Sequence, residues 1–124
     1  MAELLLGNPL FVGEGPVEQV VAIVKLLGIP TKEELYAMIH DTTELQFADI
    51  ARTPFEDVFG KDCPDAIDLL KKLLRFVPSE RLSPLEVCCH PFFDELRDPN
   101  SRLPNGGYYN VFFFFWVILL TFLY

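Results

Sequence analysis

Apolar residues recur at three- and four-residue steps along two long stretches of the chain, a spacing that predicts amphipathic helices. The first stretch opens with Pro16 at a first helical position and ends at Gly28. Its apolar face is rich in valine and consists of Val17, Val20, Val21, Val24 and Leu27. Because valine has a lower helix propensity than alanine, packing or a bound partner must supply part of this helix's stability.

The second stretch covers residues 64–75 and predicts a helix with one buried face. Pro64 opens it, acidic residues lie in its first turns, and Lys71, Lys72 and Arg75 lie in its last turns. This distribution of charge matches the helix dipole at both ends. The predicted core face consists of Ala66, Ile67, Leu70, Leu73 and Leu74.

Shorter helices are predicted from the signals at their ends. The first six residues are apolar apart from one acid and stop at Gly7, which is typical of the last turns of a helix. Thr31 with Glu34, and Ser83 with Glu86, have the spacing of capping boxes, in which two side chains accept hydrogen bonds from free backbone N–H groups. We therefore expect helices to begin after Thr31 and after Ser83.

Residues 40–59 lack a regular period but are rich in apolar side chains. These side chains are Leu45, Phe47, Phe55, Val58 and Phe59. A long loop with so many apolar residues predicts an irregular segment that packs against the rest of the protein. The pattern as a whole predicts a mainly α protein with one long packed loop.

Arg81 lies in the turn between the helix predicted at 64–75 and the helix that follows Ser83. Its neighbours Val77, Leu82 and Leu85 are apolar, so we expect a packed side-chain stem and a guanidinium that needs a carboxylate partner. The alternative is a solvated arginine in an exposed turn, because arginine is rarely buried.

The last fourteen residues, 111–124, contain no charged side chain and differ in character from everything before them. We expect residues 1–106 to form one domain and 107–124 to be an unrelated apolar tail. As a helix the fourteen residues would span about 21 Å, which is short of the roughly 30 Å hydrocarbon core of a bilayer. Two interpretations stay open, a membrane anchor in a thin bilayer and translated non-coding sequence such as an unspliced intron.

The net charge of −8 and the lack of a Lys/Arg run argue against nucleic acid as a partner. Three cysteines, two of them adjacent at Cys88 and Cys89, favour packed, reduced thiols in a cytoplasmic or nuclear compartment. No Cys-x-x-Cys or His-x-x-x-His pair accompanies them, so we assign no metal site.

The stretch from Phe76 to Phe93 combines a turn, an arginine, a short helix and the sequence His-Pro-Phe-Phe. This combination resembles the end of the C-terminal lobe of protein kinases. Three further segments, at residues 2–7, 24–31 and 92–106, resemble the glycogen synthase kinase 3 (shaggy-like) family in order and spacing. The resemblance implies an incomplete kinase C-terminal lobe, with the end of the central helix, three to four further helices and a long packed loop.

The family phosphorylates serine and threonine in proteins with ATP and Mg²⁺. The motifs that supply the phosphate-binding glycines, the lysine, the catalytic aspartate and the Mg²⁺ ligands are absent from these 124 residues. We therefore assign no catalytic, cofactor-binding or metal-binding residue and expect an inactive fragment, whose Met1 matches a position inside the family's central helix. By resemblance, Arg81 is the arginine that pairs with the glutamate of an Ala-Pro-Glu motif, and this chain has no such motif.

The resemblance also implies a partner. In the family, the helix at 16–27 and the loop at 40–59 form a groove for an amphipathic helix from scaffold proteins of the axin type. The matching positions here are Val17, Val20, Val21, Val24, Leu45 and Phe47. Leu45 stands where the family usually has phenylalanine, so we expect a shallower groove. Three functions stay open, an inactive kinase fragment, a non-catalytic scaffold-binding module and a short tail-anchored membrane protein.

Overall fold

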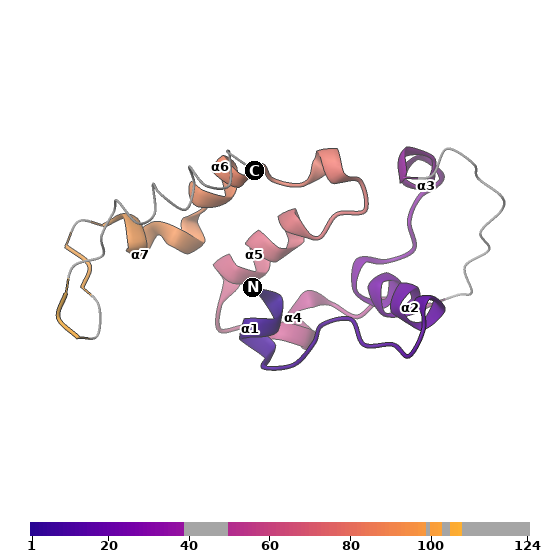
Figure 1. Cartoon of the computed structure of the whole chain (residues 1–124), viewed down its shortest axis with the longest axis horizontal. Coiled ribbons are helices and arrows are strands. Elements are labelled where there is room, and N and C mark those ends of the chain that lie inside the picture. The colour runs from indigo at the N-terminus through magenta and orange to yellow at the C-terminus, as the bar shows by residue number, and fades with distance from the viewer. Residues whose placement is uncertain (39–49, 99, 103–104, 108–124) are drawn as a thin grey trace. The chain divides into compact units, whose positions relative to one another are not determined.

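The computed structural model describes residues 1–38, 50–98, 100–102 and 105–107, and these residues are mainly helical (Figure 1). The chain divides into two compact units, Met1–Arg81 and Leu82–Tyr124. The helices of the first unit are α1 (Ala2–Leu6), α2 (Pro16–Leu27), α3 (Lys32–Met38), α4 (Phe55–Phe59), α5 (Pro64–Leu73) and the 3-10 turn η1 (Pro78–Glu80). The second unit contains α6 (Pro84–Cys88), the 3-10 turn η2 (Pro91–Phe93) and α7 (Asp94–Arg97). The prediction of a mainly α protein is confirmed.

The predicted C-terminal end of α1 and both predicted ends of α2 are found where the sequence places them. Gly7 ends α1 in the left-handed conformation, with φ 71°, and its N–H donates to the carbonyl of Glu3 at 2.8 Å. Pro16 begins α2, and Gly28 ends it with φ 96°. Both glycines adopt positive φ values that a side chain would oppose, so the sequence signal has a direct steric cause.

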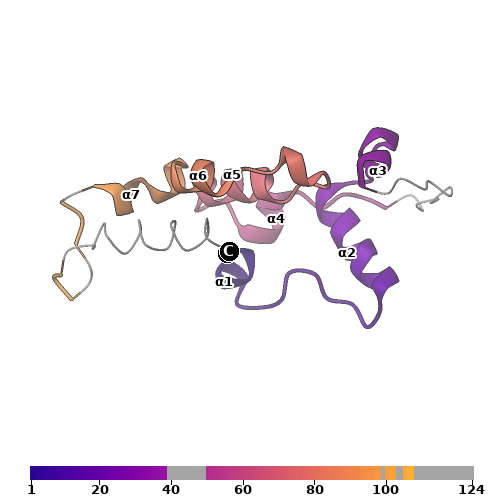
Figure 2. The ribbon, with the colours of Figure 1, turned by 45° about the horizontal axis from the view of Figure 1, so that its top comes forward.

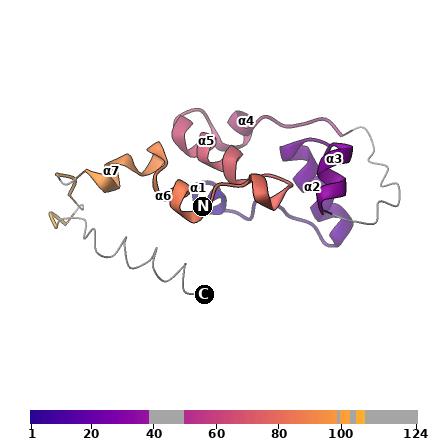
Figure 3. The ribbon, with the colours of Figure 1, turned by 90° about the horizontal axis from the view of Figure 1, so that it is seen from above.

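The core of the first unit lies where α1, α2, α4 and α5 meet. Its buried members are Ala2, Leu26, Phe55, Ile67 and Leu70. Half-buried side chains pack around them, namely Leu10, Phe11, Leu27, Val58, Phe59 and Leu74. Figure 2 shows α4 beside α5, and Figure 3 shows the same pairing from above. Residues from both halves of the first unit therefore build one core.

Helix α4 corrects the expectation that residues 40–59 are irregular throughout. Pro54 precedes the helix with φ −58°, and Glu56 and Asp57 stand in its first turn, where acids favour a helix. Phe55 is only 2% exposed, which confirms at this residue that the segment is packed. The expected count of three to four helices after the first was too low, because α4 and α7 are additional short helices.

Helix α5 ends at Leu73, two residues before the predicted end, and its buried face differs from the predicted one because Leu73 and Leu74 are only half-buried. Ala66, Ile67 and Leu70 are buried as expected, but Leu69 is also buried, with 0% of its surface exposed. Leu69 lies about 100° around the helix from Leu70, so the buried stripe is wider than the one drawn from the sequence.

In the second unit, hydrogen bonds from nearby side chains satisfy backbone groups at the ends of the short helices. The capping box at Ser83 and Glu86 is present, with the N–H of Ser83 donating to Oε2 of Glu86 at 2.8 Å. His90 is buried, and its Nδ1 accepts from the N–H of Phe92 at 3.3 Å. The guanidinium of Arg97 donates to the carbonyl oxygens of Cys88 and His90, so α7 is tied back to the end of α6.

Candidate functional site

The valine face is the set of residues on α2 for which the kinase resemblance implies a partner, namely Val17, Val20, Val21 and Val24. Its exposure changes along the helix. Val17 is 76% exposed and Val20 is 44% exposed, whereas Val21 is half-buried and Val24 is 1% exposed. The structure therefore presents the N-terminal half of the valine face to solvent and places Val24 in the interior.

The C-terminal half of α2 is fixed by the segment that precedes α4. The N–H of Thr53 donates to the carbonyl of Lys25 at 2.7 Å, and Nε of Arg52 donates to the carbonyl of Leu26 at 3.2 Å. The last carbonyls of a helix lack partners within the helix, and these two bonds satisfy two of them. Helix α2 is therefore anchored at one end while its other end carries the exposed valines.

The start of α2 is closed by its own flanking residues. Gly15 takes the cap position in an extended conformation, and its carbonyl accepts from the N–H of Gln19 at 3.1 Å. The carboxylate of Glu18 accepts from the N–H of Glu14 at 2.7 Å, which fixes the chain just before the helix. The exposed valines thus stand on a helix whose two ends are both held.

The loop side of the predicted groove lies outside the described residues, because it depends on Leu45 and Phe47. Only the helix side of that groove can be described. There, the side chains of Val17 and Val20 are exposed, and their role in binding a partner stays a prediction.

Arg81 has an environment different from the predicted one. The residue is exposed, and its Nε donates to the carbonyl oxygen of Arg75 at 2.9 Å. No described carboxylate pairs with it. The expectation of a packed stem is therefore wrong for this chain, because the η1 turn brings Arg81 to a carbonyl just after α5 and leaves the side chain in solvent.

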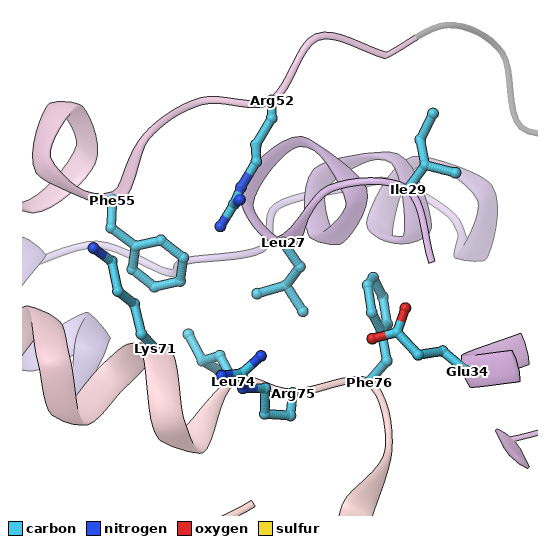
Figure 4. A pocket seen from close by; sticks show the side chains of 9 residues that line it. All are labelled: Leu27, Ile29, Glu34, Arg52, Phe55, Lys71, Leu74, Arg75 and Phe76. Atoms are coloured by element: carbon cyan, nitrogen blue, oxygen red, sulfur yellow. The ribbon is translucent and has the colours of Figure 1, made fainter. Parts of the chain in front are cut away.

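A hollow of about 180 Å³ in the first unit was not predicted from the sequence (Figure 4). Its apolar lining consists of Leu27, Ile29, Phe55, Leu74 and Phe76, and its charged lining consists of Glu34, Arg52, Lys71 and Arg75. These residues come from α2, α3, α4, α5 and the segments beside them. Side chains so far apart in the sequence carry no shared local pattern from which the hollow could be recognised.

The charged groups around the hollow are partly paired. Nζ of Lys71 lies 2.6 Å from Oε1 of Glu56 and 5.8 Å from the centre of the Phe55 ring. The hydrogen bond from Lys71 lowers the pKa of the Glu56 carboxyl below its ordinary value. Oε2 of Glu34 accepts from the N–H of Thr31 at 2.7 Å, and the N–H of Glu34 donates to Oγ1 of Thr31 at 3.2 Å, which confirms the predicted capping box.

The thiols are more exposed than expected. Cys63 and Cys89 are exposed and Cys88 is half-buried, so the prediction of packed thiols is wrong for the first two. Among the described residues, no group of three His, Cys, Asp or Glu side chains is placed to hold a metal ion. Within the same residues, no helix is both long and apolar enough to cross a membrane, and the apolar tail at 111–124 lies outside them.

No model of a known protein family matches this chain. The kinase resemblance therefore rests on the sequence motifs alone. The structure contributes the mainly helical architecture and the exposure of each predicted site residue.

Proposed function

We propose that this chain corresponds to the C-terminal part of a glycogen synthase kinase 3-like kinase lobe and acts by binding rather than by catalysis. In this proposal the exposed valines of α2 take up one apolar face of an amphipathic helix from a scaffold protein of the axin type. The observation that carries the proposal is the exposure of Val17 and Val20 on a helix anchored at its other end. Phosphoryl transfer is not part of it, because the sequence contains none of the motifs that bind ATP and Mg²⁺.

The physical basis is the removal of apolar surface from water. Two exposed valines one turn apart form a small patch that can receive the apolar residues of a partner helix at matching intervals. Burying a valine side chain fully contributes about 1.5–3 kcal/mol, and binding itself costs translational and rotational freedom. We therefore expect weak binding, with a dissociation constant in the micromolar to millimolar range.

The test is titration of the full chain with a short amphipathic helical peptide of the axin type, followed by fluorescence anisotropy. Val17→Asp and Val20→Asp should each weaken binding at least about tenfold, because a charge would be desolvated against the apolar side of the peptide. Val21→Asp is a poorer test, since Val21 is half-buried and its replacement also disturbs packing.

The matched control is Val12→Asp, because Val12 is 70% exposed and precedes α2. This variant adds the same charge to the same unit and should bind the peptide as the native chain does. Far-UV circular dichroism of all variants should show equal helix content. Equal affinity for the peptide in the native chain, Val17→Asp and Val20→Asp would refute the proposal.

A further inference from the structure

The hollow in Figure 4 contains two arginines whose charge is not neutralised by their surroundings. Neither Arg52 nor Arg75 forms an ion pair with a carboxylate of the described residues. Both guanidinium groups belong to residues that line the same hollow. Arginine presents a planar set of N–H donors that suits a carboxylate or a phosphate.

Arg52 is already oriented toward the hollow before any ligand arrives. Its Nε is used in the hydrogen bond to the carbonyl of Leu26, and the next residue, Thr53, is fixed to Lys25 by its own N–H. The two terminal nitrogens of the guanidinium remain for a ligand, and Figure 4 shows the group directed into the hollow toward Leu27. Fixing a side chain in advance reduces the entropy lost on binding.

The charges on the wall of the hollow favour an anionic ligand. Arg52, Lys71 and Arg75 contribute three positive charges, while Glu34 on the wall and Glu56, paired with Lys71 at 2.6 Å, contribute two negative charges. The remaining charge is therefore +1. A monoanion neutralises it, whereas a dianion would leave an excess negative charge beside Glu34.

The uncharged part of the wall determines which apolar group the ligand can carry and how large it can be. The apolar part of the wall consists of the half-buried Leu27, Leu74 and Phe76, with the buried Phe55 behind them. The hollow has a volume of about 180 Å³, which limits the ligand to a small molecule. We propose that this hollow binds a small monocarboxylate with an apolar ring, held by Arg52 and Arg75 through its carboxylate and by the apolar wall through its ring.

The test is titration of the full chain with benzoate, followed in ¹H–¹⁵N NMR spectra that include the arginine Nε–H signals. We expect saturable shifts with a millimolar dissociation constant, because both arginines are also exposed to water. Benzamide, which has the ring without the charge, and acetate, which has the charge without the ring, should each bind about tenfold more weakly.

Two variants distinguish the loss of an arginine in the hollow from the loss of a positive charge elsewhere on the chain. Arg75→Gln should weaken benzoate binding about tenfold. Arg52→Gln should do the same, although it also removes a hydrogen bond at the end of α2. Lys25→Gln is the matched control, because it removes an exposed positive charge of α2 that does not line the hollow, and it should bind benzoate as the native chain does.

Val17→Asp should leave benzoate binding unchanged. The test of the hollow is therefore separate from the test of the valine face. Absence of saturable shifts in the native chain would overturn the proposal. Equal benzoate affinity in Arg75→Gln and Lys25→Gln, or equal affinity for benzoate and benzamide, would overturn it as well.

Discussion

Single polar side chains close several helix ends in this chain, and those that act locally could be predicted from the sequence. The capping boxes at Thr31 and Ser83 are found as expected, because donor and acceptor lie only three residues apart. The hydrogen-bond partners of Arg81, Arg52 and Arg97 could not be predicted in the same way. Each donates to a backbone carbonyl, and only the folded chain determines which carbonyl is within reach.

Glu86 gives a prediction at this scale. Its carboxylate accepts from the hydroxyl of Ser83 at 2.7 Å and from the N–H of Ser83 at 2.8 Å, which lowers the pKa of the Glu86 carboxyl below its ordinary value of 4.5. Because the pKa is lower in the folded chain, the cap stabilises α6 above pH 4.5, and this stabilisation is lost as pH falls through the lowered pKa.

The measurement is a ¹³C NMR titration of the Glu86 side-chain carboxyl. We expect a midpoint below 4.5 in the native chain and a higher midpoint in Ser83→Ala. Ser79→Ala is the control, since Ser79 is an exposed serine outside the capping box. A midpoint that stays unchanged in Ser83→Ala would show that the hydrogen bonds do not control this carboxyl.

Among the elements, the bounds of α2 were predicted almost to the residue. The contacts that surround the helix were not predicted. Periodicity and the flanking Pro16 and Gly28 define the helix. The hydrogen bonds from Arg52 and Thr53 that anchor its end come from more than twenty residues away, and no sequence period reports them. For the same reason, periodicity could not show that Val17 is exposed while Val24 is buried on the same face.

Gly28 gives a prediction for this element. Its φ of 96° and ψ of 173° lie in a region that is accessible essentially to glycine alone. Gly28→Ala should therefore lower the free energy of unfolding by about 1–3 kcal/mol, measured by urea denaturation. The added Cβ would lie 3.6 Å from Cδ of Arg52, an ordinary contact, so the cost arises from backbone strain.

Gly15→Ser is the matched control for Gly28→Ala. Gly15 has an extended φ of −153° and open space at its Cβ position, and serine is a favourable residue at a helix start. We expect this variant to be as stable as the native chain or slightly more stable. Equal effects of the two substitutions would contradict the assigned role of Gly28.

On the scale of the whole molecule, the sequence predicts the mainly helical class but not the division into two units at Arg81. Helices follow from local patterns, whereas the units follow from contacts between distant segments. The predicted boundary between residues 106 and 107 stays a prediction, since most of the tail lies outside the described residues. The hollow could not be predicted either, because its walls come from four parts of the first unit.

The small core predicts marginal stability for the chain without a partner. The buried apolar residues among those described are Ala2, Val24, Leu26, Phe55, Ala66, Ile67, Leu69 and Leu70. Two of these are alanines, which bury little surface. A large buried side chain contributes about 1.5–3 kcal/mol, while ordering each residue of the backbone costs about 1–2 kcal/mol. In addition, Leu4, Val12 and Val17 are each at least 70% exposed.

We therefore expect a free energy of unfolding below about 5 kcal/mol in urea denaturation, together with binding of a dye specific for exposed apolar surface. A ligand that binds only the folded chain should stabilise it, by about 2.7 kcal/mol at a concentration one hundred times its dissociation constant. The amphipathic peptide should accordingly raise the urea midpoint of the native chain and of Val12→Asp, but not that of Val17→Asp. A cooperative transition near 10 kcal/mol without peptide would show that the few buried side chains stabilise the fold far more than their number implies.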